Sequence, residues 1–269
     1  METKEINVPI ENTYIHVTSF GNGSRNLIIL PGVSLIGFEN IGPAIATSYK
    51  KYYQDFTYHM IGRRKVLPDI YSIEEMAEDV YSVMNNLGIK KADFLGTSMG
   101  GMIAQNIGIA HIDAVNALVL GSTTSRLSES SKKYFEDWIE VLEKNDIVGF
   151  NRLFVNHIYS EAFIKENRLA FDYLETQGDA ADCKRFVSMC KAIINFDVYD
   201  QLSRITCPTF VINAKKDVLF PAMKDGKELA ERIAGSKFYM YEGDYGHAVY
   251  NEAPDYIQRF KDFLLNIRH

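Results

Sequence analysis

The chain has 269 residues, of which 46% are hydrophobic and 24% are charged. These proportions are typical of a globular protein and exclude a disordered chain, a collagen and a coiled coil. The formal net charge is −6, and no basic run is longer than a few residues, so no nucleic-acid partner is expected.

The sequence carries no sign of export or of a membrane anchor. Its first five residues lack the apolar core of a signal peptide, and no apolar stretch approaches the roughly 20 residues that span a bilayer. The three cysteines form no CxxC pair, which favours free thiols over a disulfide framework or a zinc site. We therefore expect a cytoplasmic protein with no membrane span and no metal.

Short apolar runs predict the strands of a largely parallel sheet. Runs such as 27–30 and 118–120 are apolar on both faces, as in strands that helices cover on both sides. An alternating stretch at 13–17 precedes them and predicts an antiparallel hairpin at the edge. The predicted parallel strands lie at 26–30, 57–61, 92–95, 117–121, 208–212 and 237–241.

Helix signals lie between these runs. Ser72 and Glu75 form a capping box before an apolar stripe at helical spacing, and Gly88 suits the end of that helix. Pro254 is expected to open the last helix. This alternation predicts an α/β fold, an open and mostly parallel twisted sheet flanked by helices.

The alternation stops between about 122 and 203, where the chain reads as almost entirely helical. The expected helices cover 131–144, 147–158, 161–176 and 180–194, and aromatic residues are dense among them. A block of this length is too long for a simple crossover between two strands. We predict a helical cap inserted at 123–202, with the core formed by 1–122 and 203–269.

A candidate nucleophile lies in the segment Gly96-Thr97-Ser98-Met99-Gly100. A buried strand leads into this G-x-S-x-G motif and a helix of small and apolar residues leads out, the context of a nucleophile elbow. The turn is tight and strained, and its glycines avoid clashes where strand and helix come close. Ser98 is therefore predicted to present its hydroxyl clear of the sheet.

A serine nucleophile needs a base and a group that orients the base. Of the six histidines, His247 follows the last predicted strand, where its loop opens on the side of the sheet toward which Ser98 points. Asp217 lies in the loop after the preceding strand and is the expected acid. Asp225 is farther from that strand end and Asp244 is nearly adjacent to the histidine, so both are weaker rivals.

An oxyanion hole requires two backbone N–H groups near the nucleophile. Met99 directly follows Ser98 at the start of a helix, where N–H groups have no partner within the helix. The loop Pro31-Gly32-Val33 follows an earlier strand. We expect the N–H groups of Met99 and Val33 to form the hole.

Together these residues resemble the α/β-hydrolase superfamily, in the single-cap branch of esterases, lactonases and proline iminopeptidase-like enzymes. The order Ser98, Asp217, His247 is that of the superfamily. Two loops depart from the sequence pattern of the superfamily. Pro31-Gly32 stands where relatives often have His-Gly, and the loop 61–68 lacks an aspartate and a glycine that relatives often have in this loop. Its Arg63-Arg64-Lys65 could attract an acidic substrate, but we expect a solvated loop.

The resemblance implies a serine hydrolase that cleaves a carboxylic ester, thioester or lactone through an acyl-enzyme. It implies a small-molecule acyl substrate, no cofactor, and a monomer or homodimer. Aminopeptidase, perhydrolase and acyltransferase activities remain open on the same triad. A receptor of the same fold that binds a small ligand without rapid turnover is a further alternative.

Overall fold

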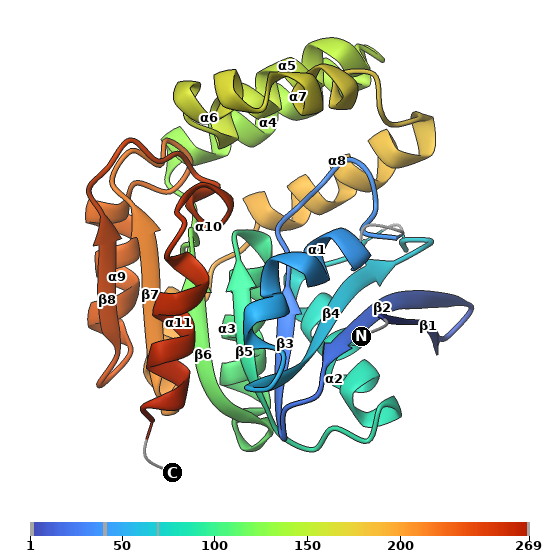
Figure 1. Ribbon diagram of the computed structural model, residues 1–269. Helices are drawn as coiled ribbons and strands as arrows, with labels where there is room; N and C mark the ends of the chain where they lie inside the picture. Colours follow the sequence, from blue (N-terminus) through green and yellow to red (C-terminus); the bar gives the residue numbers. More distant parts are fainter. Residues whose placement is uncertain (1–2, 40–41, 69, 268–269) are drawn as a thin grey trace.

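The computed structural model describes residues 3–39, 42–68 and 70–267, and eight strands within them form one sheet. The strands are β1 (Lys4–Ile10), β2 (Thr13–Gly21), β3 (Arg25–Leu30), β4 (Phe56–Arg64), β5 (Ala92–Thr97), β6 (Val115–Gly121), β7 (Thr209–Ala214) and β8 (Lys237–Tyr241). Their order in the sheet is β1-β2-β4-β3-β5-β6-β7-β8 (Figure 1). The β1–β2 and β2–β4 pairs are antiparallel and all others are parallel. The predicted α/β class and the predicted hairpin are both confirmed.

Helices cover both faces of the sheet. The α-helices of the described chain are α1 (Gly42–Tyr49), α2 (Ile73–Asn86), α3 (Met99–Ala110), α4 (Glu129–Glu143), α5 (Ile147–Ile158), α6 (Glu161–Glu166), α7 (Arg168–Leu174), α8 (Ala180–Ile194), α9 (Lys227–Arg232), α10 (Val249–Glu252) and α11 (Tyr256–Leu265). Helices α1 and α11 lie on one face, and α2, α3 and α9 lie on the other (Figure 1). Each face therefore has its own apolar core.

The helix signals read from the sequence are largely confirmed. At the start of α2 the Ser72 hydroxyl accepts a bond from the Glu75 N–H at 3.2 Å, and the Glu75 carboxylate accepts one from the Ser72 N–H at 2.7 Å. Helix α11 begins at Tyr256, two residues later than expected, because Pro254 lies in a turn. Where one helix was expected over 161–176, α6 and α7 are separated at Asn167, whose side chain bonds to a backbone carbonyl.

The chain between β6 and β7 forms a helical segment, α4 to α8, beyond the carboxyl ends of the parallel strands (Figure 1). Its aromatic residues extend the apolar core of the α2 and α3 face, and among them Trp138 packs 4.9 Å from Phe135 and 5.0 Å from Phe154 between ring centroids. Its two ends meet where Arg126 forms an antiparallel bridge with Asp197. The segment thus leaves and rejoins the sheet at one place.

Throughout the part of the chain that the structure describes, every helix is too short or too polar to cross a membrane.

Candidate active site

Ser98 lies between β5 and α3 in a strained backbone conformation, with φ 54° and ψ −123°. Its N–H donates to the Gly121 carbonyl at 2.9 Å, and its own carbonyl accepts a bond from the Thr123 hydroxyl at 2.8 Å. The end of β6 therefore holds the turn from both sides. A β-carbon on Gly96 would overlap the backbone of Gly100, which explains the glycines of the motif.

Asp217 and His247 form a buried hydrogen-bonded pair. Asp217 Oδ2 lies 2.8 Å from His247 Nδ1, and the two side chains are 0% and 1% exposed. Asp217 Oδ1 accepts bonds from the Leu219 and Phe220 N–H groups at 2.9 and 3.0 Å. With both oxygens engaged, the carboxylate is fixed, and it favours the imidazole tautomer that carries its proton on Nδ1.

His247 Nε2 is the ring nitrogen left for chemistry. It is buried, and none of the described residues supplies it with a hydrogen-bond partner. His247 and Ser98 line the same cavity of about 540 Å³. Catalytic hydrogen bonds often tighten only when substrate is bound, so a shared cavity is the relevant geometry for these two groups.

The loop after β3 reaches the same cavity. Gly32 and Val33 line it, and a β-carbon on Gly32 would lie 3.0 Å from the Ser98 β-carbon. Met99 is the first residue of α3, so its N–H has no partner within the helix. Of the two residues expected to form the oxyanion hole, Met99 therefore directly follows Ser98, and Val33 lines the same cavity as Ser98.

The rival acids lie elsewhere. Asp244 is 65% exposed and bonds to Lys216 at 2.8 Å. Asp225 is buried, and this burial raises its pKa to about 6, with a further increase from Asp217 and an opposing effect of Lys224. The hydrogen bond to His247 Nδ1 comes from Asp217.

The cavity is mainly apolar. Aromatic and aliphatic residues of the helical segment line one side, among them Phe135, Trp138 and Phe154. Among the described residues that line the cavity there is no lysine, arginine, aspartate or glutamate. Apart from His247, the described lining thus offers a substrate no carboxylate and no basic side chain.

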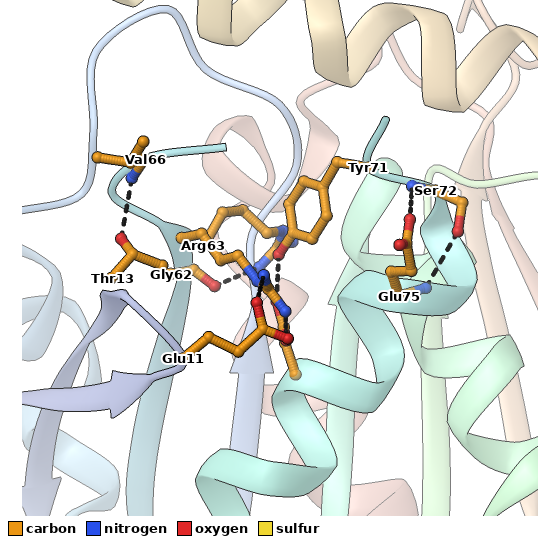
Figure 2. A network of polar contacts seen from close by, with 10 residues as sticks. Glu11, Thr13, Gly62, Arg63, Val66, Tyr71, Ser72 and Glu75 are labelled. Atoms are coloured by element: carbon orange, nitrogen blue, oxygen red, sulfur yellow. Dashed lines mark hydrogen bonds and ion pairs between the residues drawn. The ribbon is translucent and has the colours of Figure 1, made fainter. Parts of the chain in front are cut away.

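Arg63 departs from the solvated loop expected for 63–65. Its guanidinium donates to the carbonyls of Pro31 at 2.9 Å and Ile61 at 3.2 Å. It also donates to the Gly62 carbonyl at 2.9 Å (Figure 2). Burial lowers the pKa of Arg63 to about 10, while Tyr71 and Asp79 oppose this effect. Since Pro31 directly precedes Gly32, Arg63 ties the end of β4 to the loop beside Ser98.

Arg64 is also held in place. It makes two bonds to the buried Asp79 of α2, at 2.7 and 2.8 Å, and one to Glu11 at 2.8 Å. The Tyr71 hydroxyl donates to the same Asp79 carboxylate at 2.7 Å. A carboxylate within the buried stripe of α2 was a signal in the sequence for a cationic partner. Lys65, which is 43% exposed and paired with Glu39, does fit the expected solvated loop.

Comparison with known proteins agrees with this architecture. The profile of a family described as alpha/beta hydrolase fold matches residues 27–254. A protein of Rhizobium rhizogenes named as a carbamate hydrolase, RutD, is 30% identical over 190 residues, which are 68% of this chain and 70% of that protein. The 3-oxoadipate enol-lactonase 2 of Acinetobacter baylyi is 23% identical over 175 residues, which are 65% of this chain and 64% of that protein.

Solved structures share the fold over almost the whole chain. The enol-lactonase from Burkholderia xenovorans LB400 superposes with a TM-score of 0.84 and 18% identity, covering 97% of this chain and 100% of its own. A thermophilic esterase from Thermogutta terrifontis has a TM-score of 0.80 and 19% identity, covering 98% of each chain. With a family match over most of its length, the chain belongs to the α/β-hydrolase fold family and is an enzyme of the hydrolase class.

Proposed function

We propose that this protein is a serine hydrolase that cleaves a carboxylic ester, thioester or lactone through an acyl-enzyme. One observation carries the proposal: Ser98 and His247 line the same cavity, and Asp217 is bonded to the far side of the His247 ring. This is the arrangement of nucleophile, base and orienting acid that acyl transfer requires.

In the first half of the proposed reaction, Ser98 Oγ attacks the carbonyl carbon and its proton passes to His247 Nε2. Asp217 stabilises the resulting imidazolium, and the N–H groups of Val33 and Met99 bind the negative oxygen. His247 then gives the proton to the departing alcohol or thiol, which leaves Ser98 acylated. In a lactone the leaving hydroxyl stays attached to the acyl chain.

In the second half, water replaces the departed group. Water loses a proton to His247 Nε2 and its oxygen attacks the acyl carbon. The new intermediate collapses, the carboxylic acid leaves, and the proton returns to Ser98 Oγ. The protein's own residues supply each of these steps.

The cavity favours uncharged acyl substrates. A carboxylate or ammonium group inside it would lose its hydration without meeting a side chain of opposite charge. An aminopeptidase needs carboxylates that bind the α-ammonium group of its substrate. The candidates in the helical segment, Glu136, Glu140, Glu161 and Glu166, are all exposed and do not line the cavity.

The relatives' names, carbamate hydrolase and enol-lactonase, support hydrolysis at an acyl carbon. We propose that the helical segment, within 123–202, is a cap, because Phe135, Trp138 and Phe154 line the cavity from it. The cysteines are buried and free, which supports the reducing cytoplasm as the compartment.

A fluorophosphonate probe tests the nucleophile. We expect the wild type to be labelled at Ser98, as located by peptide mass spectrometry, and to hydrolyse many equivalents of an aryl ester. Ser98→Ala should lose the label and at least about 10³-fold of kcat while keeping its circular dichroism spectrum. Ser188→Ala, on α8 and outside the cavity, is the matched control and should keep both.

Two outcomes would contradict the proposal. Undiminished turnover by Ser98→Ala with a label on another serine would show that the nucleophile lies elsewhere. A single slow acylation with lasting retention of the ligand would favour a receptor. Product analysis with alcohol or peroxide as the acceptor distinguishes hydrolysis from acyl transfer and perhydrolysis.

A further inference from the structure

We infer that the cavity has a second arm, on the core side of Ser98, that receives an uncharged apolar chain of the substrate. This inference rests on the proposed function. We define the core-side arm by the described cavity residues that belong to the sheet, α1 and α11: Ile29, Met60, Leu95, Thr97, Ile45, Ser48, Tyr49, Tyr256 and Ile257. None of them belongs to the helical segment.

The floor of the core-side arm is one row of side chains across three strands. Ile29 of β3 is in register with Met60 of β4 and with Leu95 of β5. Residues in register point to the same face of a sheet, and all three belong to the apolar core under α1 and α11. The row therefore lies on the face opposite α2 and α3.

The floor connects directly to the candidate nucleophile. Side chains two residues apart on a strand share a face, so Thr97 lies above Leu95 along β5, and both line the cavity. Ser98 is the next residue. At about 3.3 Å per residue, the row of Leu95 lies roughly 10 Å from Ser98 along the chain, a suitable depth for a medium-length alkyl chain.

Helices α1 and α11 form the walls. Ile45, Ser48 and Tyr49 are spaced three and four residues apart, so they share one face of α1, and all three line the cavity. Tyr256 and Ile257 of α11 line it from the other side, and both helices lie on this face of the sheet (Figure 1).

The far end of the arm is closed. The rings of Tyr49 on α1 and Phe260 on α11 have centroids 6.4 Å apart. In the 3-10 turn Lys50–Tyr52 that follows α1, the Tyr52 hydroxyl donates to the Gln258 side chain of α11 at 3.2 Å. The two helices therefore contact each other below the arm, which limits the length of chain that it can hold.

Tyr256 places a polar group near the junction with Ser98. Its hydroxyl is buried, and no hydrogen-bond partner for it lies within the described ranges. It packs against Gly121, which pairs with Thr97 in the sheet, and a β-carbon on Gly121 would overlap it. Burial raises the pKa of Tyr256 well above its ordinary value, so the hydroxyl stays protonated and can donate to a substrate oxygen.

The chemistry of the arm selects its ligand. Its floor is aliphatic and thioether, its walls are aliphatic and aromatic, and a carboxylate there would be desolvated without a cation. Each methylene of an alkyl chain buried in such a site is worth about fourfold in kcat/KM. The predicted substrates are therefore esters or lactones whose acyl or alcohol group carries a neutral alkyl chain.

The test makes the core-side arm narrower by replacing a residue of its α1 wall with a larger one. Ile45→Trp adds a ring to the α1 wall without touching the sheet, and Ala44→Trp adds the same ring at an adjacent exposed position that does not line the cavity. Two panels are measured on the whole enzyme: 4-nitrophenyl esters from acetyl to decanoyl, and alkyl acetates from methyl to decyl. If Ile45→Trp fails to fold, Ile257→Trp narrows the arm from the α11 wall.

We expect wild-type kcat/KM to rise about fourfold per methylene in at least one panel until the arm is filled. Ile45→Trp should lose at least tenfold on the long members of that panel and less than twofold on the shortest, while Ala44→Trp resembles the wild type. An ester with a terminal carboxylate on the same chain should react at least tenfold more slowly than its neutral counterpart. An unchanged ratio of long to short substrates in a folded wall variant, in both panels, would overturn the inference.

Failure of the proposed function would look different. In that case the wild type would neither hydrolyse any ester nor take the fluorophosphonate label. The arm is then tested by calorimetric titration of Ser98→Ala with 2-decanone. Loss of 2-decanone binding when Ile45→Trp is added, together with retained binding when Ala44→Trp is added, would support the inference. No binding, or equal binding by all variants, would overturn it.

Discussion

Gly100 at the start of α3 packs directly against Leu30 at the end of β3. A β-carbon at position 100 would overlap the Leu30 carbonyl oxygen, and the next nearest atoms are also backbone, including the Pro31 carbonyl oxygen. Backbone atoms cannot turn away as a flexible side chain can. This contact therefore sets the distance between the Ser98 turn and the loop that carries Val33.

We predict that Gly100→Ala is severely destabilising, by more than about 4 kcal/mol, because the clash forces strand and helix apart. Gly235→Ala is the matched control: its φ is +73° but its β-carbon would meet nothing within 4 Å, so it should cost about 1 kcal/mol. Urea unfolding measures both. Equal effects would show that the close approach at Gly100 does not limit stability.

Asp217→Asn should reduce kcat by about 10⁴-fold, as the equivalent change does in serine proteases. The amide can no longer stabilise the imidazolium or favour the tautomer with the proton on Nδ1. Asp244→Asn, at an exposed position paired with Lys216, should change kcat by less than twofold. Steady-state kinetics with an aryl ester provides the readout, and a greater loss in Asp244→Asn would place the acid elsewhere.

Asp225→Asn should stabilise the protein in a pH-dependent manner. Burial raises the Asp225 pKa from 3.8 to about 6, so between these values the folded state binds more protons than the unfolded state. The free energy of unfolding contributed by this group therefore falls as pH rises through that window. An asparagine at this position does not titrate, so the variant does not lose stability in this way. Its free energy of unfolding should exceed that of the wild type by the largest amount at pH 7.5, and the difference should vanish near pH 4. Urea unfolding at several pH values measures this difference. An advantage of the same size at both ends would indicate a cause other than titration.

Arg63→Lys should lower kcat by about tenfold to hundredfold with a smaller change in KM. One ammonium group cannot reproduce the three bonds to carbonyls, and the loop that holds Val33 would shift relative to Ser98. Lys65→Gln, at an exposed position two residues further along the chain, is the control and should keep its kcat. If Arg63→Lys changed only the free energy of unfolding, the loop would not depend on Arg63 for its position.

Tyr256→Phe should raise the free energy of unfolding by about 1 kcal/mol, because it removes a buried hydroxyl that has no partner in the described structure. The same change should raise KM for long-chain esters, which would lose the proposed hydrogen bond. Thermal unfolding and chain-length kinetics on one preparation measure both effects. A less stable variant with an unchanged KM would mean that the hydroxyl serves the fold instead.

The sequence predicted the parts of the fold that depend on local pattern. Apolar runs such as those of β3 and β6 are covered on both faces, and the capping box of α2 involves residues three apart. The proximity of Asp217 and His247 followed from two loops at the carboxyl edge of neighbouring parallel strands. Both predictions depend only on the local residue pattern and on the order of strands and loops in the sequence.

Features that depend on distant partners were not predictable. Helix α1 has no acidic residue in its first turn and no basic residue in its last, and it packs against β2, from which β3 separates it along the chain. Arg63 reads as a surface cation until Pro31, 32 residues earlier, supplies the acceptor. The core-side arm depends on the register of β3 with β4 and β5, which no single segment contains.

The bridge between Arg126 and Asp197 has a consequence for how this protein can diversify. Because β6 and β7 are adjacent, the helical segment departs and returns through two neighbouring stretches of chain, and the Ser125 carbonyl accepts a bond from the Val198 N–H at 2.9 Å. Insertions, deletions or exchanges within 129–157 or 161–194 therefore leave the strand ends that precede Ser98, Asp217 and His247 unaltered. They also spare Ile158, whose carbonyl accepts a bond from the Ala248 N–H at 2.9 Å beside His247. Mutation and recombination can reshape one wall of the cavity in successive generations while the bond-breaking groups keep their positions.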